Sequence, residues 1–175
     1  MRALISLLLL TGPAPGLPAV SVPHEAVLDA GMTKAFADRA AAESKAALER
    51  LEKDPSRSRE EKDALEKRLS RLRLAVYETP KTLDETVAWF ESHNTGAQFV
   101  FAERNLESDL QDGIRSGAIK ADPSQAEKAM GQRGRSARWN RLDSNLEIAV
   151  EDHLIDPRNG SITRKTFILI TTLGD

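Results

Sequence analysis

Two segments of alternating apolar side chains, residues 146–155 and 162–172, constrain the fold more than any other part of this chain. The sequence Asp-Pro-Arg-Asn-Gly separates them, and Gly160 can take the positive φ that ends a short hairpin loop. Strict alternation is typical of a strand with one buried face. The sequence therefore predicts a C-terminal β-hairpin over residues 146–172.

The loop also predicts a register for this hairpin. Pairing Asp156 with Ser161 across the loop sorts most of the apolar residues onto one face. The opposed pairs are then Leu146/Thr171, Ile148/Leu169, Asp152/Lys165 and His153/Arg164.

The N-terminal third has helical periodicity. Residues 24–53 predict one long alanine-rich helix, because apolar side chains recur along it at steps of four and seven. Ser58 and Glu61 form a capping box that starts a second helix after a short loop. The two helices predict an antiparallel helical hairpin over residues 22–71. Two interpretations remain open: a solvated helix pair, and an arm for self-association.

At Leu72 the apolar period changes from helical spacing to two, which predicts a strand. A second capping box, Thr82 to Glu85, starts a helix, and residues 97–102 predict a further short strand. Residues 103–131 predict a helical insertion. The fold class is therefore α+β, with the helical hairpin followed by a small, mostly antiparallel sheet with one or more packing helices, in a domain over residues 72–175.

Residues 1–21 have the parts of a secretory signal peptide: Arg2, a short apolar run, and small residues before a cut after Ala19 or Ser21. No apolar run reaches the roughly 20 residues that would cross a bilayer. The chain has no cysteine, so it has no disulfide and no lipid-modified cysteine. These features predict a secreted or periplasmic protein of bacterial type.

One stretch resembles a known family. The sequence Val-Tyr-Glu-Thr-Pro at 76–80, then Leu-Asp-Glu-Thr-Val-Ala-Trp-Phe at 83–90, then Phe-Val-Phe at 99–101 is similar to small α+β domains of exported bacterial proteins. In that family a strand ends in a Tyr-Pro-Gly-type turn before a helix with a Val…Phe-Tyr signature. This chain departs from it: no Gly follows the Tyr, Trp-Phe stands for Phe-Tyr, and the lipoprotein cysteine is absent. The resemblance implies export and an α+β fold, and no activity.

The sequence contains few groups for catalysis. It has no phosphate-binding glycine loop, no dinucleotide fingerprint and no nucleophile elbow, so no cofactor is expected. Glu147, Glu151 and His153 share a face of their strand and could supply an acid–base pair or a weak metal site. Alternation places Asp152 on the opposite face. The expected presence of Arg164 beside His153 favours an ordinary polar sheet face, and no metal site is assigned.

A second candidate site is a basic loop that runs into a strand. It holds four arginines and one aromatic residue within nine positions, without an acid: Arg133, Arg135, Arg138, Trp139 and Arg141. Such a set can bind an anion or an acidic surface. Without Arg2, 24 basic residues remain against 27 acidic ones, a net charge of −3, which argues against nucleic acid. Arginine along an edge strand also discourages aggregation.

Three hypotheses follow for function. The first is a non-catalytic exported binding or envelope-associated module that can self-associate through its helices. The second is a hydrolase that uses Glu147, Glu151 and His153. The third is an anion or acidic-surface binder through residues 133–141. The absence of a complete catalytic motif favours the first.

Overall fold

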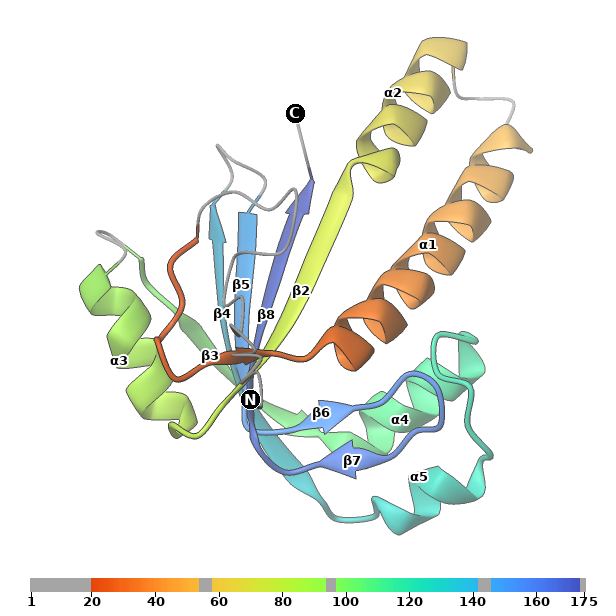
Figure 1. The fold of residues 1–175 in the computed structure, drawn as a ribbon. Coiled ribbons are helices and arrows are strands. Elements are labelled where there is room, and N and C mark those ends of the chain that lie inside the picture. The colour runs from red at the N-terminus through yellow and green to blue at the C-terminus, as the bar shows by residue number, and fades with distance from the viewer. Residues whose placement is uncertain (1–19, 54–57, 94–96, 142–145, 174–175) are drawn as a thin grey trace, which may run out of the picture.

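A computed structural model describes residues 20–53, 58–93, 97–141 and 146–173 (Figure 1). The fold is α+β, built on a six-stranded antiparallel sheet of order β1-β2-β8-β5-β4-β3. The strands are, in that order, Val27–Leu28, Leu72–Thr79, Thr166–Leu173, Leu146–Glu151, Arg133–Arg141 and Val100–Asn105. A separate two-stranded sheet pairs β6 (Leu154–Ile155) with β7 (Ile162–Thr163). The five described helices are α1 (Ala30–Glu52), α2 (Arg59–Ser70), α3 (Leu83–His93), α4 (Leu106–Arg115) and α5 (Ser124–Lys128).

Helices cover the two faces of the large sheet differently (Figure 1). On the face that α3 covers, called here the α3 face, Phe90 and Val87 pack against Ile148 and Ile168 in the main core. On the opposite face, called the α1 face, α1 packs through Met32 and Phe36 near Val76, Leu154 and Phe167. Only the first part of α1 lies against this smaller core, because none of its residues after Ala35 is fully buried. The α1 face is therefore only partly covered.

The capping boxes predicted by the sequence are present. Ser58 Oγ accepts from the Glu61 amide at 3.2 Å, and Glu61 Oε2 accepts from the Ser58 amide at 3.0 Å. Thr82 and Glu85 make the same reciprocal pair at the start of α3. Gly160, with φ 73°, ends the predicted hairpin loop, where its amide donates to the Asp156 carbonyl. Each of these local signals specified an element boundary correctly.

The first helix begins later than predicted. Residues 24–28 are not helical: Val27 and Leu28 form strand β1 at the edge of β2, and the helix starts at Ala30. Asp29 caps it by accepting from the Met32 amide at 2.8 Å. Asp29 also donates its own amide to the carbonyl of Val76, which ties the helix start to β2. The apolar periodicity extends back past Asp29 toward the N-terminus. The helix nevertheless begins only after Asp29, because this residue caps it and is bonded to β2.

The predicted register of the C-terminal hairpin is correct only near its loop. Leu154 pairs with Thr163, as predicted, but Leu146 pairs with Thr172, one residue beyond the prediction. An extra residue on the returning strand, between β7 and β8 around Arg164, shifts the register. Lys165 consequently pairs with Glu78 at 2.6 Å and not with Asp152. The shift places Phe167 and Leu169 on the α1 face.

The segment between β3 and β4 carries the predicted helices. The predicted strand at 97–102 lies at 100–105, so the helical part begins at Leu106 and not at residue 103. Leu110, Ile119 and Ala126 form a small second core under the tip of the hairpin. Residues 1–19 of the predicted leader lie outside the described part of the chain. Within the described part, no helix combines the length and apolar character needed to span a bilayer.

Candidate functional site

A cleft of about 690 Å³ lies on the α1 face, bordered by α1, the large sheet and α4. Glu147, Glu151 and His153, which the sequence placed on one strand face, all line it. Arg138, predicted as part of the basic loop, lines it as well. The two candidate sites predicted from the sequence, the acidic strand face and the basic segment, therefore both contribute side chains to one cleft.

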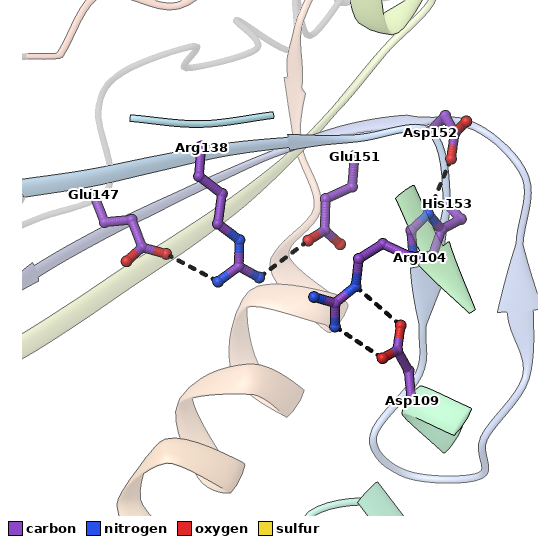
Figure 2. Close-up of polar contacts among 7 residues, drawn as sticks. All are labelled: Arg104, Asp109, Arg138, Glu147, Glu151, Asp152 and His153. Atoms are coloured by element: carbon purple, nitrogen blue, oxygen red, sulfur yellow. Dashed lines mark hydrogen bonds and ion pairs between the residues drawn. The ribbon is translucent and has the colours of Figure 1, made fainter. Parts of the chain in front are cut away.

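Arg138 lies between the two glutamates (Figure 2). Strand pairing places it opposite Ala149, so its neighbours on the same face of β5 are Glu147 and Glu151. Nη1 is 3.8 Å from Glu147 Oε1, and Nη2 is 3.5 Å from Glu151 Oε1. Both distances are longer than those of a short charge-assisted hydrogen bond. The guanidinium of Arg138 is therefore shared between the carboxylates of Glu147 and Glu151, and its contact with each is long.

His153 is oriented by a neighbour that alternation had excluded. Asp152 Oδ1 lies 2.9 Å from His153 Nδ1, so the prediction that Asp152 points away from His153 is wrong (Figure 2). The reason is that β5 ends at Glu151, and Asp152 occupies a bend where side chains no longer alternate. The same Oδ1 accepts from the Arg135 amide at 2.8 Å, which fixes the carboxylate.

The imidazole of His153 lies against the backbone of β4, and only 3% of the residue is exposed. A Cβ added at Gly134 would lie 2.6 Å from His153 Cε1 and 3.0 Å from Cγ. The ring therefore fits only because residue 134 has no side chain. Arg164, expected beside His153, instead donates to the Arg133 carbonyl and to Gln132.

Two further ion pairs line the cleft and were not found from the sequence. Arg104, at the end of β3, binds Asp109 of α4 through two hydrogen bonds of 3.0 Å each. Arg39 of α1 donates to Glu43 at 2.8 Å on the helical side of the cleft. Each is an ordinary local charge pair in sequence, four or five residues apart, and only the fold brings them together.

The basic residues of β4 are divided between the two faces of the sheet. Residues 133–141 form strand β4 throughout and not a loop, so alternation places Arg138 on the α1 face and Arg133, Arg135 and Trp139 on the α3 face. Arg135 binds Asp84 of α3 at 2.8 Å and 3.1 Å, and this hydrogen bonding lowers the pKa of the Asp84 carboxyl. Trp139 packs partly buried on the α3 face, and Arg133 is exposed. The side chain of Arg141 lies outside the described part.

The cleft has the chemistry of a charged binding site. Its lining carries five carboxylates and three guanidinium groups: Glu43, Asp109, Asp112, Glu147 and Glu151 against Arg39, Arg104 and Arg138. Among the described residues, no three His, Asp or Glu side chains are arranged to hold a metal ion. Comparisons with protein-family models, with curated proteins and with solved structures give no match.

Proposed function

We propose that this protein is an exported binding module whose ligand occupies the cleft on the α1 face. The observation that carries the proposal is the cleft itself, where paired charges from α1, the sheet and α4 surround a volume of about 690 Å³. Ligand sites are commonly concave, with a few converging polar groups. Loosely held pairs such as Arg138 with Glu147 and Glu151 can exchange partners with a ligand.

Export is part of the proposal. It rests on the leader sequence and on the position of the first described residues: Val20 and Val22 pack against the main core, and Pro23 is fully buried. Val20 directly follows Ala19, and Val22 directly follows Ser21, which are the two predicted cleavage positions. A chain recovered outside the cytoplasm should have the mass of one starting at Val20 or Val22. Recovery of the uncleaved chain in the cytoplasm alone would contradict export.

The cleft is tested by blocking it. Ala40 of α1 lines the cleft, whereas Ala46 is exposed on the same helix outside it. NMR titration with diamines, amino acids, dicarboxylates, phosphate and dipeptides should show one class that shifts the amide resonances of Glu151 and His153. Ala40→Trp should abolish these shifts and Ala46→Trp should keep them. Shifts that persist in Ala40→Trp, or no shifts with any class, would remove the proposed function.

A second candidate function is hydrolysis with His153 as general base. It is favoured by the Asp152–His153 hydrogen bond, since a carboxylate on one ring nitrogen orients the other for proton transfer. His153 Nε2 would take a proton from an attacking water and return it to the leaving group, with Glu147 and Glu151 beside the substrate. Turnover of a panel of esters should then be lost in His153→Phe and kept in His93→Phe. Equal turnover in both variants would exclude it.

We also infer that α1 and α2 form an antiparallel helical hairpin able to self-associate. Lys62 Nζ donates to the Glu52 carbonyl, and side chains of both helices line a second, more apolar groove of about 440 Å³. The mass of the chain in solution decides whether this pair mediates self-association.

A further inference from the structure

We infer that the ligand of the cleft is an organic cation with N–H donors, such as a primary amine, and that His153 Nε2 accepts a hydrogen bond from it. This inference rests on the proposed function and names the chemical class of its ligand. Three observations carry it: the protonation pattern of His153, the unpartnered nitrogen that this pattern creates, and the charge of the cleft.

The hydrogen-bond partners of His153 determine its tautomer. An ionised carboxylate can only accept, so Asp152 Oδ1 at 2.9 Å requires a proton on Nδ1. The Arg135 amide donates to the same oxygen, which is the arrangement expected for a carboxylate. In neutral His153 the other nitrogen, Nε2, therefore carries a lone pair.

That lone pair has no partner among the described residues. Gly134 lies nearest to Nδ1, Cε1 and Cγ, so Nε2 is on the ring edge away from β4. No described residue hydrogen-bonds to Nε2, and His153 lines the cleft although only 3% of the residue is exposed. Nε2 is not among the buried side-chain atoms that lack a partner, so its lone pair is accessible to the solvent of the cleft. A ligand with a hydrogen-bond donor can take the place of that solvent.

The charges around it select a cation. The lining has five carboxylates against three guanidinium groups, and one of the five, Asp112, pairs with Arg115 outside the lining at 3.4 Å, which leaves an excess of one negative charge. Each arginine already has a carboxylate partner: Arg39 with Glu43, Arg104 with Asp109, and Arg138 with two glutamates. The net attraction is therefore for positive charge, and an anion would meet both the carboxylates and the lone pair of His153.

The lining also selects N–H donors over quaternary ammonium. Quaternary cations are bound in cages of several aromatic rings. Phe36 is the one aromatic side chain among the described residues of this lining. A primary amine can instead donate to His153 and to a carboxylate such as Glu151 at the same time.

Three probes of similar length test the inference: putrescine, its fully N-methylated bis-quaternary analogue, and adipate. Each is titrated into the isotope-labelled full chain, and amide shifts of Gly134, Glu151 and His153 are followed by NMR. Putrescine should saturate these shifts and bind about tenfold more tightly than the quaternary analogue, which has the charge without the donors. Adipate should leave them unchanged.

Variants separate the roles of the side chains. His153→Phe keeps a ring on Gly134 and should reduce the tenfold preference to about onefold, whereas His93→Phe, at the exposed end of α3, should keep it. Glu151→Gln should weaken both cations together. Because His153→Phe changes a buried residue, the spectrum of each variant also reports whether it is folded. If His153→Phe is unfolded, Asp152→Asn is the second variant. It removes the carboxylate that fixes the proton on Nδ1 of His153, so it should also reduce the preference for putrescine over the quaternary analogue.

The outcomes distinguish this inference from the function beneath it. Saturable shifts by adipate but not by putrescine would overturn the cation assignment and leave a ligand cleft in place. Equal affinity of putrescine and its quaternary analogue for the wild type would overturn the role of His153. If none of the three probes shifts these amides, the ligand class is wrong. The proposed function then depends on the broader panel and the Ala40→Trp variant.

Discussion

A single carboxylate, Asp156, holds the tip of the C-terminal hairpin. Its side chain is almost fully buried and accepts from the Arg158 amide at 2.8 Å and from the Arg158 guanidinium at 2.6–3.1 Å. Hydrogen bonding by the Arg158 side chain is the main cause that lowers the pKa of Asp156 below its ordinary value, and the Arg158 backbone amide lowers it further. The ionised form of Asp156 is therefore the one that the folded loop stabilises.

We expect Asp156→Asn to lower the free energy of unfolding by about 1–3 kcal/mol at pH 7, since the amide cannot accept all of these bonds. The direction with pH follows from the lowered pKa. The wild-type advantage is present above the ordinary Asp pKa of about 4 and is lost as the pH falls through the lower pKa of the folded protein. Urea unfolding at pH 7 and at about pH 3 measures both. A difference between the proteins that grows on acidification would contradict this account.

At the scale of single residues, the sequence predicted which face a side chain occupies only where the backbone is a regular strand. Glu147 and Glu151 share a face and a cleft, as two-residue alternation predicts. Asp152 does not follow it, because the strand has ended. The role of Gly134 could not be predicted, because no sequence pattern indicates that a histidine ring packs against this glycine. Arg138 was recognised as a candidate, but its acidic partners come from another strand.

At the scale of elements, two matched capping boxes differ in what their helices bury. The helix behind Thr82, α3, buries Phe90 completely in the main core, whereas no described side chain of α2, behind Ser58, is buried. We expect Thr82→Ala to lower the free energy of unfolding by about 1 kcal/mol and Ser58→Ala by less than about 0.5 kcal/mol. Urea unfolding followed by the fluorescence of Trp89 and Trp139 measures both.

The reason for this difference is that α2 can unwind without opening the core, so its cap contributes to local and not global stability. An equal loss in Ser58→Ala and Thr82→Ala would show instead that α2 unfolds together with the sheet. Capping boxes and the Gly160 turn were the elements that sequence predicted best, because their hydrogen bonds are local. The register of β5 with β8 was not predictable, because one extra residue near Arg164 shifts it.

At the scale of the whole molecule, the two faces of the sheet have different surroundings. The α3 face is closed by α3 and by the segment that contains Val22 and Ala26. The α1 face is closed only near Met32 and Phe36, and beyond them α1 runs away from the sheet with α2 beside it (Figure 1). This asymmetry leaves the cleft open. It also leaves the second groove, lined by Leu48 and Leu69, half exposed.

The proposed self-association would cover this groove with a second copy of the chain, and the mass of the protein in solution tests it. We expect light scattering coupled to size exclusion to give more than the 19.2 kDa of one full chain, with a mass that rises with concentration. Leu69→Lys should return the protein to a monomer, because association would then bury a charged side chain in the groove. Ala64→Lys, at an exposed position of α2, is the matched control and should leave the mass unchanged. Truncation of α1 is not a suitable test, since Met32 and Phe36 belong to the core of the α1 face.

A monomer at every concentration would contradict self-association and would mean that the apolar groove remains exposed to solvent. The role of α1 would then be to border the cleft.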